Sequence, residues 1–256
     1  MKENEIKPAG RYRLLDTIRG IAVLNMIWYH ALWDMVYIFG FYMPWYLGMG
    51  AYIWQQAICW TFILVSGMCS YMSGNGIRRG AFVTGCGFLI SLFLYVFSPQ
   101  TPNLFGVLVL LGCSMMVVSR LKPHLLRLDG KRGAPLCFAA FLITRYVSRG
   151  YLGMGLFKIY LPQSLYSGYI SAFLGFPPSW FHSTDYFPMI PWIFLFLTGF
   201  YIMEAAALDK RAQRLLRMGD LPALGFIGRH SLFIYMAHQP VIYLILSAAS
   251  NIIYAF

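Results

Sequence analysis

The sequence predicts an all-α protein, a polytopic bundle of transmembrane helices, and two observations lead to this fold class. Hydrophobic residues make up 59% of the 256 residues and charged residues only 11%, with a mean hydropathy of +0.61. Soluble domains carry about 25% charged residues, so this composition indicates an integral membrane protein. The second observation is that apolar runs long enough to cross a hydrocarbon core of roughly 30 Å recur along the chain.

Seven apolar segments are the predicted membrane spans. They lie at about 16–39, 50–73, 81–98, 104–119, 134–148, 188–207 and 224–250. The third, fourth and fifth segments are short or weakly bounded, so a count of six or eight also fits the pattern.

A longer connection, 149–187, separates the fifth and sixth segments and is rich in Tyr, Gly, Pro and Phe. This composition predicts an outer re-entrant or interfacial loop rather than a solvated linker. No change of composition indicates a second domain. We therefore expect residues 1–256 to form one membrane-embedded domain, with residues 1–13 as a cytoplasmic N-terminal arm.

The positions of lysine and arginine predict the orientation. With a cytoplasmic N-terminus, all of the 20 Lys and Arg residues except Arg145, Arg149 and Lys158 fall on the inner side. Positive charge in short cytoplasmic loops is the main determinant of membrane topology. Seven spans then place the C-terminus outside. The net charge of +11 is explained by topology and anionic membrane lipid, and no nucleic-acid partner is expected.

The five cysteines predict neither a disulfide framework nor a metal site. They are scattered through apolar stretches without a Cys-x-x-Cys motif or a Cys/His cluster. We expect them to be small packing residues, and we expect no bound metal.

Ionisable residues inside the apolar segments indicate function, because charge at membrane depth is costly. In the first segment, His30 lies about 16 Å along the helix from Arg19. Asp34 follows one turn later on the same face, where it can orient the His30 ring and raise its basicity. This is the arrangement of a general base. The alternative is a buried polar pair that only fixes helix packing.

The last segment carries a second deep histidine, which is a further candidate for a catalytic role. His238 lies about 13 Å along a helix from Arg229, near the middle of the membrane. Arg19 and Arg229 each open a polar helix end that leads to one of these histidines. Guanidinium groups there suit the phosphates of a cytosolic anionic donor. His230, at the cytoplasmic edge, and the loop residues Arg78 and Arg79 are further candidates for donor binding.

The outer side offers candidates for binding an acceptor. His182 and Asp185 precede the sixth segment, where they either form an acceptor pocket or order the loop. Tyr186 and Trp33 belong to a group of aromatic residues near the outer side. Such a belt is usual at a membrane interface, and aromatic faces also stack against sugar rings.

Three stretches together resemble the bacterial members of the heparan-α-glucosaminide N-acetyltransferase catalytic-domain family, within the wider class of membrane acyltransferases. They are RLLDTIRGIAVLNMIWYH at 13–30, STDYFPMIPW at 183–192 and GRHSLFIYMAHQP at 228–240. They run from the first segment to the last in the family's order.

The resemblance implies a membrane acetyltransferase that takes acetyl groups from cytosolic acetyl-CoA and acetylates a sugar or glycan on the opposite face. It further implies a location in the bacterial cytoplasmic membrane. His30 and His238 match histidines of the family pattern. Its polar positions are matched by Asp16, Arg19, Asp34, Asp185 and Arg229.

Two departures from the family pattern bear on the mechanism. Val109 stands where a family motif often ends in histidine, and the segment 40–48 holds no histidine that could serve as an acetyl carrier. We therefore expect direct transfer of the acetyl group, without an acyl-enzyme intermediate.

Two other classes of function fit the same polar residues. One is a small-molecule transporter or flippase, which discontinuous helices or inverted repeats would favour, and the sequence displays neither. The other is a structural membrane protein whose polar residues only specify helix packing. The sequence leaves open the acceptor, N- or O-acetylation, acetyl or a longer acyl group, direct transfer or an acyl-enzyme, and the formation of a homodimer.

Overall fold

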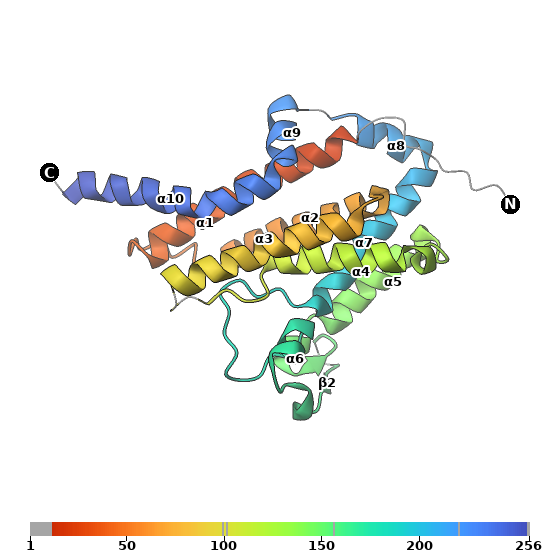
Figure 1. Cartoon of the computed structure of the whole chain (residues 1–256), viewed down its shortest axis with the longest axis horizontal. Helices are drawn as coiled ribbons and strands as arrows, with labels where there is room; N and C mark the ends of the chain where they lie inside the picture. The colour runs from red at the N-terminus through yellow and green to blue at the C-terminus, as the bar shows by residue number, and fades with distance from the viewer. Residues whose placement is uncertain (1–11, 99, 101, 156, 220, 255–256) are drawn as a thin grey trace. The chain divides into compact units, whose positions relative to one another are not determined.

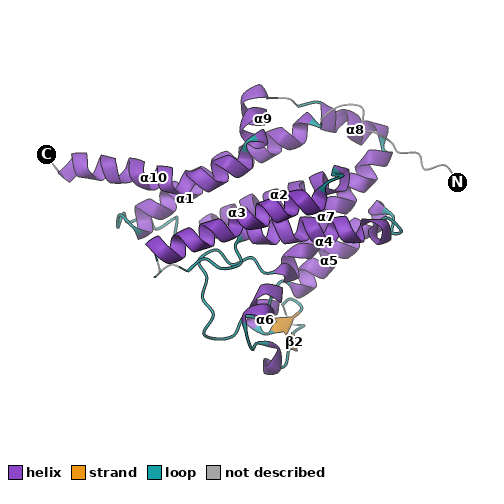
Figure 2. Ribbon diagram, viewed as in Figure 1, coloured by secondary structure: helices purple, strands orange, loops and turns teal. Residues whose placement is uncertain are grey.

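In the part of the chain that the structure describes, the protein is mostly helical, with loops and one small β ladder (Figure 2), which confirms the all-α membrane-bundle class. The structure is a computed structural model that describes residues 12–98, 100, 102–155, 157–219 and 221–254. Most of the predicted N-terminal arm, residues 1–11, lies outside the described residues. The order of the helices along the chain can be followed in Figure 1.

The chain divides into two compact units, and α2 (Met49–Met72) and α7 (Met189–Leu208) contribute to both. Unit 1 comprises residues 1–62 and 206–256, and unit 2 comprises residues 63–205. The prediction of a single membrane-embedded domain stays a prediction.

Unit 1 is built on the long first helix. Its elements are α1 (Arg13–Tyr37), the first part of α2, α8 (Lys210–Arg217), α9 (Pro222–Arg229) and α10 (Ser231–Tyr254). The N-terminal half of α1 packs against α9, and its C-terminal half runs along α10 (Figure 1).

Unit 2 contains the remaining helices and the long connection. Its helices are α3 (Gly76–Phe97), α4 (Val107–Leu125), α5 (Gly130–Thr144), α6 (Tyr169–Leu174) and most of α7. The connection also contains 3₁₀ turns at Val147–Arg149 and Gln163–Leu165 and the antiparallel strands β1 (Tyr151–Leu152) and β2 (Ile159–Tyr160). The placement of this connection at the outer membrane surface stays a prediction.

Every predicted span overlaps a helix. Among the described residues, four helices are long and apolar enough to cross a membrane: α3, α4, α7 and α10. The third and fourth segments, which look short in the sequence, extend to helices of 22 and 19 residues. The fifth is a helix of 15 residues, about 22 Å long, which is less than a hydrocarbon core.

The last predicted span is wrong in its first part. Residues 224–250 do not form one helix, because the chain breaks at His230 between α9 and α10. The reason is a tertiary contact within unit 1. A Cβ at Gly20 of α1 would collide with the Leu224 carbonyl, and a Cβ at Gly228 of α9 would collide with the Asp16 carbonyl. Glycine at both positions lets the two helix backbones touch.

A second pair of glycines brings α2 and α7 together inside unit 2. A Cβ at Gly67 would collide with the Phe196 carbonyl oxygen, and a Cβ at Gly199 would collide with that of Leu64. Glycine at the contact points of membrane helices allows this close backbone approach. The crossing of α2 and α7 therefore depends on the absence of two side chains.

We expect Gly67→Ala to destabilise the protein by about 1–3 kcal/mol, because the new methyl group forces the two backbones apart. The measurement is thermal unfolding in detergent micelles. Gly85→Ala in α3 is the matched control, since a Cβ there meets nothing within 4 Å. Equal melting temperatures for the two variants would contradict this prediction.

Candidate active site

The two deep histidines meet where α1 and α10 run together. The ring centroids of His30 and His238 are 4.9 Å apart, and we refer to these residues as the histidine pair. Asp34 lies one turn along α1 from His30 and is fully buried. The structure therefore brings together the three residues that the sequence predicts to be catalytic.

Asp34 does not hydrogen-bond to His30, which corrects one expectation. Its Oδ1 accepts a hydrogen bond of 2.6 Å from the side-chain amide of Gln239 on α10. This contact between helices positions the carboxylate in place of the expected pairing along one helix. Gln239 was missed by the sequence reasoning. The available signal was an amide next to His238 in an apolar helix, where polar groups need partners.

Three polar atoms around this contact are buried without a hydrogen-bond partner among the described residues. They are Asp34 Oδ2, His238 Nε2 and Gln239 Oε1. Most buried polar atoms in native proteins are satisfied, and an unsatisfied one calls for a bound water, a ligand or a chemical role. Here the three atoms belong to linked residues, because Gln239 follows His238 in the sequence and donates a hydrogen bond to Asp34. The three atoms therefore mark one site.

The hydrogen bond of His238 determines which of its ring nitrogens carries the proton. Nδ1 lies at hydrogen-bond distance from the Tyr235 carbonyl oxygen. Because a carbonyl oxygen only accepts, Nδ1 is the donor, and in the neutral ring Nε2 keeps its lone pair. A buried imidazole that donates a hydrogen bond from one nitrogen and keeps a free lone pair on the other is suited to act as a general base.

Within unit 1, His30 contacts the ring of Tyr29, which belongs to a cluster of aromatic side chains from α1, α2 and the loop between them. The Tyr29 ring packs edge-on against His30 at 6.0 Å and against Trp54 at 5.5 Å. The indole N–H of Trp54 donates to Asn25 Oδ1 at 2.9 Å. The Tyr46 hydroxyl donates to the Tyr29 carbonyl, and burial raises the pKa of this phenol, so it stays a donor.

The predicted donor-binding residues of unit 1 lie at two helix ends. Arg19 forms an ion pair with the buried Asp16 at 4.0 Å, within the first two turns of α1. Arg229 and His230 are exposed at the end of α9. The His230 ring packs on Phe226 at 4.3 Å, and the Arg229 guanidinium lies over the same ring at 6.0 Å.

Two further predicted donor residues belong to unit 2. Arg78 and Arg79 are exposed in the first turn of α3. As for metals, no group of three His, Cys, Asp or Glu side chains gathers as ligands in the part of the chain that the structure describes.

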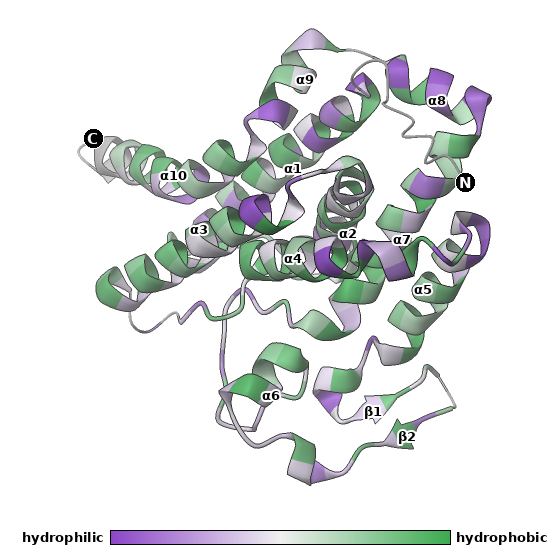
Figure 3. Ribbon diagram, turned by 45° about the vertical axis from the view of Figure 1, so that its right-hand side comes forward, coloured by the Kyte–Doolittle hydropathy of each residue, from purple (hydrophilic) through white to green (hydrophobic). Residues whose placement is uncertain are grey.

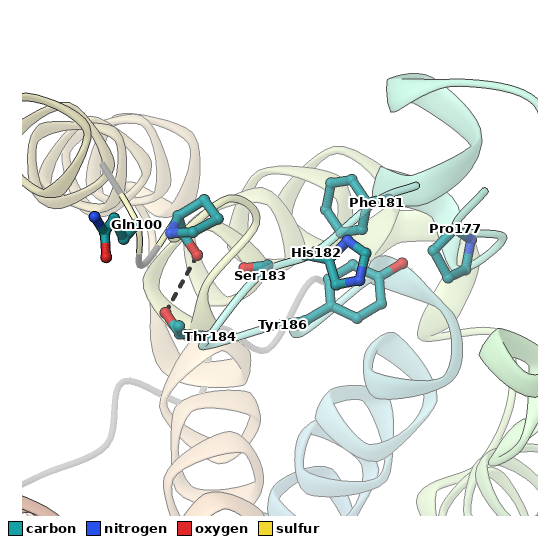
Figure 4. Close-up of a pocket in the computed structure, with 8 residues that line it drawn as sticks. Gln100, Pro177, Phe181, His182, Ser183, Thr184 and Tyr186 are labelled. Atoms are coloured by element: carbon teal, nitrogen blue, oxygen red, sulfur yellow. Dashed lines mark hydrogen bonds between the residues drawn. The ribbon is translucent and has the colours of Figure 1, made fainter. Parts of the chain in front are cut away.

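An open pocket of about 410 Å³ lies in unit 2 beside the segment that precedes α7 (Figure 4). It is lined by Gln100, Pro102, Pro177, Phe181, His182, Ser183, Thr184 and Tyr186. Two of the predicted acceptor residues, His182 and Tyr186, are therefore lining residues. The lining ring of Phe181 packs on that of Tyr186 at 5.1 Å and also on the ring of Phe105 at 5.9 Å.

Hydrogen bonds between two loop segments hold this pocket open. Thr184 donates its N–H to the Pro102 carbonyl at 2.9 Å, and the Ser183 hydroxyl donates to the Leu104 carbonyl at 2.8 Å. The Tyr186 hydroxyl donates to the Ala172 carbonyl, and burial raises its pKa. Sequence reasoning missed Ser183 and Thr184, because only the fold brings residues near 103 and 184 together.

Asp185 and Trp33 do not line the pocket. Asp185 points to the start of α4, where its Oδ2 accepts from the Val107 N–H at 3.2 Å. A carboxylate at a helix N-terminus satisfies an unpaired backbone donor and the helix dipole, so the loop-ordering alternative describes Asp185. Trp33 belongs to unit 1, where its ring packs on Tyr37 at 5.1 Å.

Comparisons with known proteins agree with the motifs that carry the resemblance. Residues 11–240 match the family described as heparan-alpha-glucosaminide N-acetyltransferase, catalytic. Comparison with curated proteins and with solved structures gave no match. The family match covers most of the chain and spans α1 to the first turns of α10, including the histidine pair. The chain therefore belongs to the heparan-α-glucosaminide N-acetyltransferase catalytic family and is a membrane acetyltransferase.

Proposed function

We propose that the protein transfers an acetyl group from cytosolic acetyl-CoA to a sugar or glycan on the opposite membrane face, with a buried histidine as general base. Family membership supports the acetyltransferase activity. The observation that carries the choice of base is the bare, buried Nε2 of His238 beside His30.

In this mechanism His238 Nε2 removes the proton from an acceptor hydroxyl or amine. The acceptor oxygen or nitrogen then forms a bond to the thioester carbonyl carbon, and the bond from that carbon to sulfur breaks. CoA leaves as a thiolate and takes up the proton that His238 removed, which restores the neutral imidazole, and no covalent acyl-enzyme forms. The second imidazole of the site belongs to His30, whose ring lies beside that of His238. Asp34 supplies the negative charge that compensates the imidazolium formed at the base.

The donor enters from the cytoplasmic side in the predicted topology. Arg19 and Arg229, with His230 and the neighbouring basic loops, meet its phosphates, because guanidinium groups bind phosphate oxygens through paired hydrogen bonds. The ion pair of Asp16 with Arg19 supports this role by holding the guanidinium at a fixed place on α1.

The pocket of unit 2 binds the acceptor sugar in this proposal. Its size falls within the roughly 300–1,000 Å³ of small-molecule sites, and its wall combines aromatic rings with hydroxyl and imidazole groups. Sugar rings stack on aromatic faces and hydrogen-bond to such polar groups.

The first experiment incubates proteoliposomes with radiolabelled acetyl-CoA outside and a panel of glycosides inside, starting with α-glucosaminides. Labelled, acetylated glycoside in the lumen is the expected result. Release of label as acetate alone, or transport of the glycoside without acetylation, would contradict the proposed function and favour the transporter alternative.

We expect His238→Ala to lower kcat by about 10²- to 10⁴-fold, because the variant lacks the general base. Its melting temperature should stay close to that of the wild type in this assay, since the ring is only one of several contacts between α1 and α10. His124→Ala is the matched control, because His124 is exposed at the end of α4, a helix of unit 2. A kcat within twofold of the wild type for His238→Ala would exclude this residue as the base.

We expect Asp34→Asn to lower kcat at least tenfold while it changes thermal stability little. The amide oxygen of asparagine still accepts the Gln239 hydrogen bond, so only the negative charge is lost. Steady-state kinetics and thermal unfolding on the same preparation separate the two effects. If activity is retained, Asp34 serves helix packing, as the structural alternative holds.

We expect Phe181→Ala to raise KM for the acceptor glycoside by about tenfold and to leave KM for acetyl-CoA unchanged, because the ring lines the pocket of unit 2. Phe157→Ala is the control, since this ring is 85% exposed and lies outside the pocket. Equal effects on both KM values would show that the pocket does not distinguish acceptor from donor.

A further inference from the structure

A basic pocket lies along α8, and the sequence analysis assigned its cations only to topology and anionic membrane lipid. It has a volume of about 350 Å³ and lies entirely in unit 1. Its lining residues are Lys210, Gln213, Arg214, Arg217 and Met218. Figure 3 shows α8 as a hydrophilic helix among mostly hydrophobic ones.

The three cations of this pocket form one stripe along the helix. Lys210, Arg214 and Arg217 are spaced i, i+4 and i+7, which places them on the same face. All three are exposed, and no carboxylate of the described residues forms an ion pair with them. Like charges at this spacing destabilise a helix, so an anion between them would relieve the repulsion.

The opposite face of α8 fixes the helix to unit 1. Leu216 is buried, and the residues that follow are tied to the start of α1. The Thr17 hydroxyl donates to the Gly219 carbonyl at 3.0 Å and accepts from the Leu221 N–H at 3.4 Å. The cationic stripe is therefore held at a defined place beside the N-terminal turns of α1.

The chemistry of the stripe suits a group with several phosphates. Arginine binds phosphate through two parallel hydrogen bonds, and lysine adds a compact positive charge. The charge of Arg19 is already partly neutralised by Asp16, whereas the α8 stripe is not neutralised in this way. The stripe is therefore a further group of cations in unit 1 whose charge is available for an anion.

The stripe also lies at a useful distance from the histidine pair. Thr17, which holds the end of α8, and His30 are separated by about 20 Å along α1, at a rise of 1.5 Å per residue. The extended pantetheine arm of CoA has a comparable reach. A nucleotide held at α8 can therefore deliver its thioester to the level of His30.

We propose that the α8 pocket binds the 3′-phospho-ADP group of the CoA donor through Lys210, Arg214 and Arg217. This inference rests on the proposed function and extends it, because it assigns the nucleotide to a helix that the resemblance does not single out. The 3′-phosphate and the two phosphates of the diphosphate bridge match a site with three cations.

The test measures binding of CoA and of dephospho-CoA, which lacks the 3′-phosphate, to detergent-purified full-length protein by calorimetry. Arg214→Gln and Arg217→Gln should each weaken CoA binding about tenfold, the loss expected for one charge-assisted hydrogen bond. The wild type should prefer CoA over dephospho-CoA, and at least one pocket variant should lose this preference. Arg211→Gln is the matched control, because Arg211 lies on the same helix outside the pocket and should change affinity less than twofold.

Three outcomes would overturn the inference, and they can be told apart. Unchanged CoA affinity in all variants, with acetyl transfer intact, rejects the α8 site and leaves the proposed function standing. No CoA binding to folded wild-type protein, together with no acetyl transfer, rejects both. A lipid headgroup offers similar phosphate chemistry, so phosphatidylglycerol that co-purifies with the wild type is also quantified. Loss of this lipid from the pocket variants with unchanged CoA affinity identifies anionic lipid as the occupant.

Discussion

The hydrogen bond between Asp34 and Gln239 is the interaction on which the candidate site depends. Other acidic residues of the described chain serve helix N-termini: Asp185 accepts from the first turn of α4, Glu204 from Gly130 of α5, and Asp209 from Arg211 of α8. Asp34 lies inside a helix whose own backbone donors are already used. Its partner must therefore be a side-chain donor, and the amide of Gln239 on α10 provides it. That requirement sets the register of α1 against α10 and thereby places His30 against His238.

The scarcity of hydrogen-bond partners also explains the other helix contacts of unit 1. An apolar environment leaves few groups to satisfy a polar atom, so helices must approach closely wherever polar atoms have to meet. Gly20 and Gly228 provide that approach between α1 and α9, and the Thr17 hydroxyl then joins α1 to the chain that follows α8. The break at His230 is a consequence, because α9 lies on α1 and α10 begins a new helix.

Composition and periodicity were sufficient to predict the fold class and the rough position of every long helix, since a hydrocarbon core demands long apolar segments. They were also sufficient to single out His30, Asp34 and His238, because ionisable residues are rare at depth. Contacts between distant parts of the chain were not predictable in this way. The apolar pattern runs on through His230, and nothing local reveals that Gly228 touches Asp16. Gln239 was missed for the same reason, since its role depends on its contact with Asp34, which only the fold reveals.

In the proposed mechanism the carboxylate of Asp34 has a role although it is not hydrogen-bonded to the base. Before the proposed transfer His238 is neutral, with its proton on Nδ1, and a buried neutral imidazole requires no counter-charge. When Nε2 takes the acceptor proton, an imidazolium appears in a medium that solvates charge poorly. Asp34 then supplies the opposite charge, and Gln239 keeps the carboxylate in place before that moment without neutralising it. A hydrogen bond from Nδ1–H to Asp34 would raise the basicity of Nε2, but in this structure Nδ1 lies at hydrogen-bond distance from the Tyr235 carbonyl oxygen instead. In the proposed mechanism the compensating charge therefore acts without a hydrogen bond to the base, from a carboxylate that Gln239 holds in place.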